Sequence, residues 1–311
     1  MPSQLTDTIL MIAPDSFGYN MQTAGSNSFQ NKPAEEPEVL RKKALNEFNA
    51  MTQKLSDLGV DLLILSNDNE VDTPDAVFPN NWFATYEDGT VILFPMLSEN
   101  RRLERSRETL EEVFDSSDLA VSKYIDYSEY EKQGLILEGT GSLVLDRKNN
   151  TVYAIESERT DKVLFERYCS DMNVPEDNRI FFHAYDESGS PIYHTNVIMG
   201  IGEGFAVICS ECIQGSEQAE VISKLRSSGL EVIEISYSQL KNFCGNILNV
   251  KNIQGESLIV MSSRAFSSFT APQLEVLRKY GTPVDVNIDT IETIGGGSAR
   301  CMMAEIFLQK K

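Results

Sequence analysis

Apolar and polar positions repeat along this chain in one pattern that occurs five times. A loop containing glycine or asparagine leads into an apolar hairpin with a polar turn, and an amphipathic helix and a β-branched strand follow. A repeat of roughly fifty residues is typical of an array or a closed ring of supersecondary units, since each unit needs its neighbours to bury its apolar face. The predicted helices are Glu36–Leu58, Glu99–Ser116, Glu158–Met172, Glu217–Ser228 and Pro272–Tyr280, and the strands after them are Val60–Leu65, Val121–Tyr127, Arg179–Tyr185, Glu231–Ile235 and Pro283–Ile288.

The two ends of the sequence favour a closed ring. The fifth hairpin lacks a return strand before Lys311, and Met1–Ala13 is an apolar strand with no unit before it. If these segments pair, the fifth unit is complete. We therefore expect one α/β domain over residues 1–311, in which five ββαβ-like units surround a central pocket with pseudo-fivefold symmetry. The long polar segment Ser16–Pro37 is a candidate lid over that pocket.

Composition narrows the class of protein. The 311 residues carry 27 basic and 47 acidic side chains, which gives a net charge of −20 at pH 7. Such a surface repels phosphate backbones and anionic bilayers, so nucleic-acid and membrane partners are disfavoured. Met1–Ile12 lacks the basic segment of a signal peptide, and no apolar run reaches the ~20 residues of a membrane span. Because the five cysteines have irregular spacing, we expect a reducing, cytoplasmic compartment.

A cysteine in the last repeat loop is the candidate nucleophile. Cys301 follows the glycine-rich segment Gly295–Arg300, in which the glycines allow close approach of a ligand and Arg300 can stabilise a thiolate. A buried core cysteine is the alternative interpretation. A cysteine nucleophile needs a proton-transfer partner, and the chain has two histidines. His194 lies at the loop position of the repeat, whereas His183 lies inside a predicted strand, so His194 is the candidate.

Three further polar residues occupy this loop position in the first, second and third units. Glu138 follows an apolar run, where an unpaired carboxylate would be costly, and a solvated loop glutamate is the alternative. Asn81 and Asn196 carry amides that can bind a planar polar ligand, although asparagines also begin hairpins for structural reasons. Their shared position in the repeat favours a common site for all three.

Two other motifs carry no functional hypothesis. Cys209 and Cys212 form a lone CxxC pair without a second pair or a nearby histidine, which disfavours a metal or redox role. No glycine-rich phosphate loop lies between a strand and a helix, so nucleotide binding has no support.

Four loop motifs occur in one order along the chain: Pro74–Asn81, Glu138–Gly141, His194–Asn196 and Gly296–Met302. In that order they resemble motifs of the guanidino-modifying (pentein) superfamily, which comprises arginine deiminases, dimethylarginine dimethylaminohydrolases and amidinotransferases. The corresponding family motifs are a segment that ends in two acids, EGxD, HxD and a glycine-rich loop that ends in the nucleophile. The resemblance covers nearly the whole chain, and it implies a five-bladed α/β propeller.

The resemblance also implies a mechanism. Cys301 would attack the central carbon of a guanidino or ureido group, and His194 would protonate the leaving amine and then activate water. Glu138 would hold a substrate nitrogen and orient His194. No metal or organic cofactor is required, and the implied partner is a small amino-acid substrate. Its amine would contact Asp75, its carboxylate would contact Arg101 and Arg159, and the remaining implied binding residues are Asn20, Asn81, Asn196 and Arg300.

Three positions depart from the family pattern. Asn81, Gly141 and Asn196 stand where the family has acids that clamp a cationic guanidinium. An amide can donate to a carbonyl oxygen, which a carboxylate cannot do, so we expect a neutral ureido group such as that of citrulline. The segments Phe78–Trp82 and Gly18–Asn20 most resemble the citrulline-utilisation hydrolases.

Two other functions stay open at this point. An amidinotransferase would use the same residues but pass the amidino group to an amine acceptor. A non-catalytic propeller of the ribosome anti-association type is the second alternative, and a net charge of −20 suits a ribosomal partner poorly. The sequence also leaves the oligomeric state open, a homo-oligomer included.

Overall fold

The computed structural model describes residues 2–67 and 71–311 and contains five three-stranded sheets. In each sheet two antiparallel strands are followed by a third strand parallel to the second, as the repeat predicts. The sheets are β3 (Phe83–Thr85), β4 (Thr90–Leu93) and β5 (Lys123–Asp126); β6 (Leu143–Asp146), β7 (Thr151–Ile155) and β8 (Arg179–Phe182); β9 (Met199–Ile201), β10 (Phe205–Ile208) and β11 (Glu231–Glu234); β12 (Leu248–Lys251), β13 (Ser257–Ser262) and β14 (Thr282–Val286); and β15 (Ala304–Ile306), β1 (Thr8–Ile12) and β2 (Asp61–Leu65).

The fifth sheet is assembled from both ends of the chain. β15 pairs antiparallel with β1, with Leu10 opposite Ala304, and β1 pairs parallel with β2. The side chain of Thr6 adds a hydrogen bond to the carbonyl of Ile306. The expected closure of the ring is therefore confirmed, although Met1, the first residue of the expected strand, lies outside the described residues.

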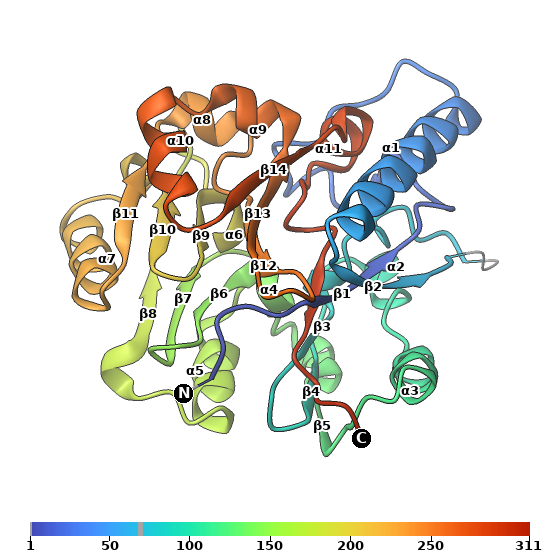
Figure 1. The fold of residues 1–311 in the computed structure, drawn as a ribbon, viewed down its shortest axis with the longest axis horizontal. Helices are drawn as coiled ribbons and strands as arrows, with labels where there is room; N and C mark the ends of the chain where they lie inside the picture. Colours follow the sequence, from blue (N-terminus) through green and yellow to red (C-terminus); the bar gives the residue numbers. More distant parts are fainter. Residues whose placement is uncertain (1, 68–70) are drawn as a thin grey trace.

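The longer helices form the outer layer of the ring, and the strands lie inside it (Figure 1). Helix α1 (Pro37–Asp57) buries an apolar stripe at helical spacing, which includes Leu40, Phe48 and Leu55. Burial of one such side chain stabilises the fold by about 1.5–3 kcal/mol. The other helices are α2 (Glu99–Arg102), α3 (Arg107–Ser116), α5 (Lys162–Asp171), α7 (Ser216–Ser227), α8 (Tyr237–Lys241), α9 (Ser263–Ser268), α10 (Ala271–Arg278) and α11 (Asp289–Gly295), with 3₁₀ turns η2 (Ser128–Gln133), η3 (Glu176–Asn178) and η4 (Ser210–Cys212).

The helix predicted over Glu99–Ser116 is two helices in the structure. The break falls between α2 and α3, and the Ser106 side chain accepts a hydrogen bond from the Thr109 backbone N–H at 3.2 Å. A serine that caps a new helix competes with continuation of the preceding one.

The first strands of the sheets lie toward the centre of the ring, where β15 contacts β3 and β9 contacts both β6 and β12. Short turns lead into these strands: η1 (Pro79–Asn81) before β3, α4 (Gly139–Ser142) before β6 and α6 (Thr195–Ile198) before β9. Less regular turns lead into β12 and β15. This arrangement brings residues from all five repeat loops together at one end of the ring.

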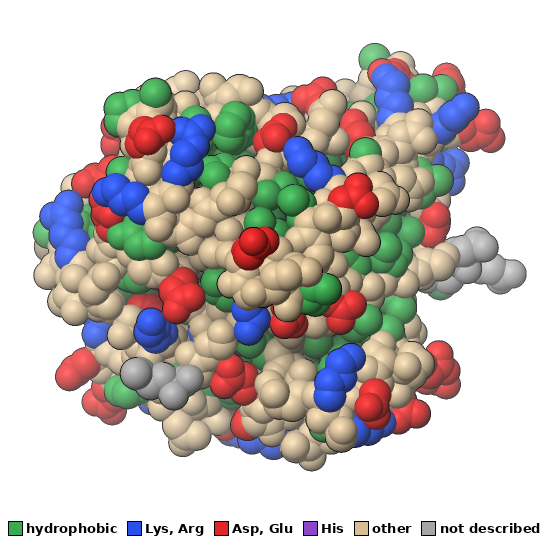
Figure 2. Space-filling view, in the orientation of Figure 1, with side chains coloured by type: hydrophobic (Ala, Val, Ile, Leu, Met, Phe, Trp, Pro, Cys, Tyr) green, Lys and Arg blue, Asp and Glu red, His purple; other side chains and the backbone are tan. Residues whose placement is uncertain are grey.

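Charged side chains of both signs are spread over the surface seen in Figure 2. Among the described helices, none has the length and apolar content needed to cross a bilayer.

Candidate active site

Cys301 lies in a tight turn between α11 and β15. Its backbone N–H donates to the Ser298 carbonyl at 2.9 Å. The preceding glycines are required by packing, because a Cβ atom at Gly295 or Gly297 would lie 2.8–2.9 Å from the Phe78 ring. Gly296 has a φ of +68°, which disfavours other residues. The turn therefore holds the Cys301 side chain at the ring centre, where it is 5% exposed.

Two amide side chains surround the Cys301 sulfur. The Nδ2 atom of Asn246 lies 3.3 Å from Sγ, and its Oδ1 atom lies 3.5 Å from Sγ. The Nδ2 atom of Asn196 lies 3.6 Å from the same sulfur. Because Asn196 belongs to α6, which His194 precedes directly, the nucleophile candidate lies against the turn that carries the histidine candidate.

His194 and Glu138 form a buried pair. The Nε2 atom of His194 lies 2.9 Å from Oε2 of Glu138, and Arg159 Nη1 lies 3.4 Å from the same oxygen. The other carboxylate oxygen accepts the Leu97 backbone N–H at 3.0 Å. An ionised carboxylate only accepts hydrogen bonds, so Nε2 carries the proton and Nδ1 of His194 is free to act as a base.

The electrostatics of the pair favour a carboxylate and a neutral imidazole. Burial opposes ionisation of Glu138, but Arg159 and the His194 hydrogen bond outweigh it and hold the pKa of Glu138 below its usual value. Burial lowers the pKa of His194 to about 4, and Glu138 offsets this only in part. At neutral pH the imidazole therefore has an unprotonated nitrogen available for proton transfer.

Four buried polar atoms in this cluster have no hydrogen-bond partner within the described residues. They are two acceptors, Asp75 Oδ1 and Asn196 Oδ1, and two donors, Asn81 Nδ2 and Arg159 Nε. Buried polar groups are almost always hydrogen-bonded in folded proteins. A polar ligand with both donors and acceptors would satisfy these four atoms.

The expected amino-group contact, Asp75, is buried beside the candidate lid. One of its oxygens accepts hydrogen bonds from Asn20 at 2.7 Å and from Thr23 at 3.1 Å. Burial raises the pKa of Asp75. Asn20 thus contacts Asp75 and helps to orient its carboxyl group.

Arg101 is engaged by protein groups, which departs from its expected role as a carboxylate anchor. It forms a bidentate ion pair with Glu104, with contacts of 2.9–3.2 Å. It also donates to Asn81 Oδ1 at 2.7 Å and to the backbone carbonyl of Phe78 at 3.1 Å. A substrate carboxylate would have to displace Glu104, so of the two expected anchors Arg159 is the one with a donor to offer.

Arg300 forms an ion pair with Glu305, and its expected contribution to thiolate stabilisation stays a prediction. Its guanidinium donates to Glu305 and to the Met303 carbonyl, both at 2.9 Å.

The glycine at position 141, where the family pattern has an acid, is explained by packing. A Cβ atom at Gly141 would lie 2.4 Å from Asn81 Nδ2 and 2.8 Å from His194 Nδ1. An acidic side chain at this position would therefore displace both neighbours. The replacement by glycine keeps the reactive nitrogen of His194 uncovered.

The candidate lid covers the site. Ser26 and Thr23 contact Arg159, and Asn31 donates its backbone N–H to the Thr293 carbonyl at 2.8 Å. Phe29 packs against the ring of Tyr193, with 6.2 Å between centroids. Each predicted site residue is at most 8% exposed, which is consistent with a covered pocket.

Asn246 is a site residue that we did not assign from the sequence. It lies in the fourth repeat loop, at a position similar to those of Asn81 and Asn196. That similarity could have identified Asn246 as a site residue. The contact of Asn246 with Cys301, however, depends on closure of the ring.

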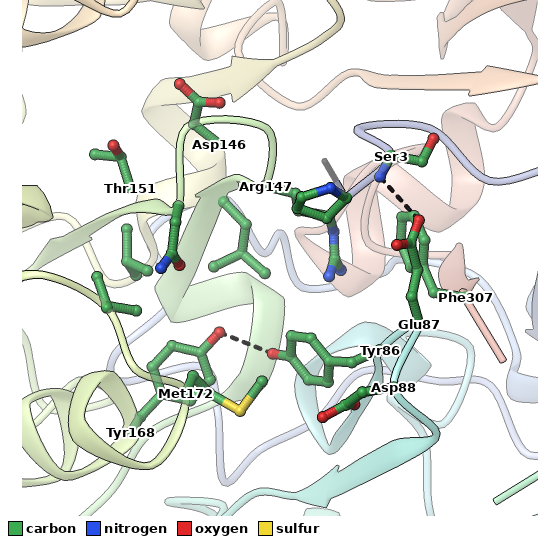
Figure 3. Close-up of a pocket in the computed structure, with 15 residues that line it drawn as sticks. Ser3, Tyr86, Glu87, Asp88, Asp146, Arg147, Thr151, Tyr168, Met172 and Phe307 are labelled. Carbon is green, nitrogen blue, oxygen red and sulfur yellow. Dashed lines mark hydrogen bonds between the residues drawn. The ribbon is translucent and has the colours of Figure 1, made fainter.

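A separate cavity of about 270 Å³ lies away from the predicted site residues (Figure 3). Its lining includes Tyr86 and Tyr168, whose hydroxyl groups are 2.8 Å apart. The Arg147 guanidinium stacks over Phe307 at 4.0 Å. These polar groups contact one another or aromatic rings, and no candidate nucleophile lines this cavity.

Comparison with known proteins supplies independent evidence. The family model described as "N,N dimethylarginine dimethylhydrolase, eukaryotic" matches residues 13–308, a range that contains every predicted site residue. A search of curated proteins gave no significant match.

Solved structures share the fold. ArgZ, an arginine dihydrolase from the ornithine–ammonia cycle in cyanobacteria, has 16% identity and a TM-score of 0.72 over 96% of this chain and 40% of its own. The N-terminal domain of ArgZ covalently bound to a reaction intermediate has 16% identity and a TM-score of 0.71, covering 97% and 99%. DDAH from Pseudomonas aeruginosa, in complex with citrulline, has 16% identity and a TM-score of 0.62, also covering 97% and 99%. This chain thus spans about 40% of full-length ArgZ.

Proposed function

This chain belongs to the N,N-dimethylarginine dimethylhydrolase family, and from that premise we propose that it hydrolyses a C–N bond of a guanidino or ureido amino acid through a covalent intermediate on Cys301. One observation carries the proposal. Cys301 contacts Asn196 in the turn that follows His194, and His194 is hydrogen-bonded to Glu138. A nucleophile, a base and a group that orients the base thus come from three different units.

The first half-reaction forms the covalent intermediate. The Cys301 sulfur attacks the central carbon of the planar group, and the thiol proton passes to Nδ1 of His194. The C–N bond to the leaving amine then breaks, and His194 gives that proton to the leaving nitrogen. A guanidino substrate leaves a thiouronium on Cys301, and a ureido substrate leaves a thiocarbamate.

The second half-reaction regenerates the enzyme. Neutral His194 takes a proton from water as the water oxygen attacks the adduct carbon, the C–S bond breaks, and His194 returns the proton to the Cys301 sulfur. Glu138 keeps the proton of the resting imidazole on Nε2, so Nδ1 is the nitrogen that exchanges protons in both steps. The low pKa of His194 supports this cycle because each step begins with a neutral imidazole.

The unpartnered buried atoms support a free amino acid as substrate. Asp75 Oδ1 is an acceptor for a substrate ammonium group, and Arg159 Nε is a donor for its carboxylate. Arg159 also contacts the candidate lid through Ser26, so a bound carboxylate would lie under that segment.

A ureido group fits the planar end of the site better than a guanidinium does. Arg101 donates to Asn81 Oδ1 and so turns the Asn81 Nδ2 donor toward Gly141 and His194. A carbonyl oxygen can accept from this donor, whereas a guanidinium has no acceptor to offer. Asn196 Oδ1 is a matching acceptor for a substrate NH₂ group. We therefore place citrulline-like amino acids first among the substrates.

The test is release of ammonia, urea or a methylated amine from arginine, methylated arginine, citrulline and agmatine. We expect the highest kcat/KM with citrulline and the lowest with agmatine, which has no carboxylate for Arg159. Turnover that requires glycine as an amine acceptor would instead identify an amidinotransferase. No release from any of the four compounds would favour the non-catalytic propeller.

A further inference from the structure

Asn246, from the fourth unit, contacts the nucleophile and has no part in the mechanism above. It is 1% exposed and lies in the turn between α8 and β12. Its Oδ1 atom accepts from the Cys301 thiol at 3.5 Å, and its Nδ2 atom is 3.3 Å from the same sulfur. One amide can therefore serve the thiol as an acceptor and the thiolate as a donor.

The backbone next to Asn246 is in an unusual conformation. Phe243 has a φ of +60°, a region that large side chains rarely adopt. Its carbonyl accepts the Asn246 backbone N–H at 2.9 Å, and its ring packs 5.2 Å from that of Phe29 in the candidate lid. Asn246 Nδ2 also donates to the Asn196 carbonyl at 2.9 Å. Strained backbone of this kind persists only where the surroundings fix it, and it clusters at active sites.

The cations near Cys301 are engaged by carboxylates. Arg300 is paired with Glu305, and Arg159 is paired with Glu138. His194 is neutral at pH 7, because burial lowers its pKa to about 4. A neutral ureido substrate would bring no positive charge either. Apart from the imidazolium that forms when His194 takes the thiol proton, the groups that contact the sulfur as donors are the amides of Asn196 and Asn246.

We propose that Asn246 is a further catalytic residue, which together with Asn196 stabilises the Cys301 thiolate by donating hydrogen bonds to Sγ. Its place in the reaction rests on the proposed function. As the thiol proton moves to Nδ1 of His194, the Asn246 contact changes from acceptance at Oδ1 to donation at Nδ2. The sulfur electron pair then forms the bond to the substrate carbon, and Asn246 itself is unchanged.

The test is the pH dependence of Cys301 alkylation by iodoacetamide in the free enzyme. The wild type is compared with Asn246→Ala, which removes the amide, and with the nearly isosteric Asn246→Asp, which replaces the donor by a carboxylate. Asn249→Ala is the matched control, because Asn249 is 3% exposed and donates to Ser257 and to the Leu258 carbonyl, away from the thiol.

Both Asn246 variants should raise the pH of half-maximal alkylation by about one unit or more, which means about tenfold less thiolate at neutral pH. The Asn249→Ala profile should match the wild type. Glu292 also titrates in this range, since burial raises its pKa to about 7 and it accepts a hydrogen bond from Ser298 in the nucleophile turn. Glu292 is present in every variant, so it does not cause a difference between their profiles. The same holds for the other charged or titratable groups around the site, which are Asp75, Glu138, Arg159, Tyr193, His194 and Arg300.

Unchanged profiles in the Asn246 variants would overturn the proposal, as would an equal shift in Asn249→Ala. Thermal unfolding identifies a variant that has lost the fold. The alkylation profile of the other Asn246 variant then tests the proposal. Failure of the proposed function would look different. The wild type would release no ammonia, urea or methylated amine from any of the four substrates, whatever its alkylation profile.

Discussion

Two histidine–glutamate pairs of similar length lie in contrasting parts of the molecule. His194 is 2.9 Å from Glu138 at the ring centre, and His183 is 3.0 Å from Glu217 on the surface. The His194 side chain is 3% exposed and that of His183 is 48% exposed. Burial lowers the pKa of His194, whereas the hydrogen bond to Glu217 raises the pKa of His183. A carboxylate partner alone therefore does not determine whether a histidine is charged. In these two pairs the degree of burial determines the direction of the pKa shift.

The largest effect is expected at the nucleophile beside the central pair. Cys301→Ser should abolish turnover and leave the thermal unfolding midpoint nearly unchanged, because a hydroxyl is a far weaker nucleophile at neutral pH. In the wild type, iodoacetamide should label Cys301 before Cys169 and Cys244, for which burial raises the pKa to about 12. Ammonia or urea release by Cys301→Ser at the wild-type rate would refute the proposed mechanism.

Exchange of each histidine for alanine tests the comparison directly. His194→Ala should lower kcat by about 10²–10⁴-fold, which is the usual range for a positioned proton-transfer group. His183→Ala should leave kcat unchanged, since this side chain contacts Glu156 and Glu217 on the surface. Steady-state kinetics of both variants decide the matter, and a reversed outcome would move the acid–base role to the outer pair.

A change of charge at the ring centre should alter substrate preference. Asn196→Asp adds a carboxylate beside the planar end of the site, so the ratio of kcat/KM for arginine to that for citrulline should rise by about tenfold or more. The ratio is informative even if kcat falls, because Asn196 also contacts Cys301. A wild-type enzyme that already prefers arginine by a large factor would show that Asn196 does not select for charge.

The smallest effect concerns stability in acid, and it has opposite signs in the two pairs. Between pH 6.5 and about 4 the unfolded chain binds a proton at His194 that the folded chain does not, so stability falls by up to about 1.4 kcal/mol per pH unit. The raised pKa of His183 adds stability below pH 6.5 that is lost as the pH rises through its folded value, and exposure limits this to less than about 1 kcal/mol.

Urea unfolding at several pH values measures both contributions. His194→Gln should flatten the acid loss of stability between pH 6.5 and 4. His183→Gln should preserve that slope and lower stability slightly near pH 5.5. A steeper acid loss in His194→Gln would contradict a neutral His194 in the folded state.

The ring could be predicted from the sequence because its units repeat one pattern of apolar and polar residues along the chain. The predicted helices and strands recur in the structure within a few residues, apart from Glu99–Ser116, which is split into α2 and α3, and Thr270 and Gln273 form a capping box at the start of α10. Periodicity depends on neighbours along the chain, so it survives without knowledge of the tertiary structure.

The pairing of side chains within the site was harder to predict from the sequence. His194 and Glu138 meet as expected, but Arg101 pairs with Glu104 three residues later, and Arg300 pairs with Glu305. The Arg101 pair has the spacing of helical neighbours and was visible in principle. The contact between Asn246 and Cys301 joins the fourth and fifth units and follows only from the closed ring.

The division of the site among separate units also fixes the order in which its parts are synthesised. A ribosome completes Glu138, His194 and Asn246 well before it reaches Cys301, and the fifth sheet needs β15 to pair with β1. A nascent chain can thus fold its early units while it still lacks a nucleophile. Under the proposed mechanism, reactivity begins only once the last repeat joins the first, so an incompletely translated chain would not react with amino-acid substrates.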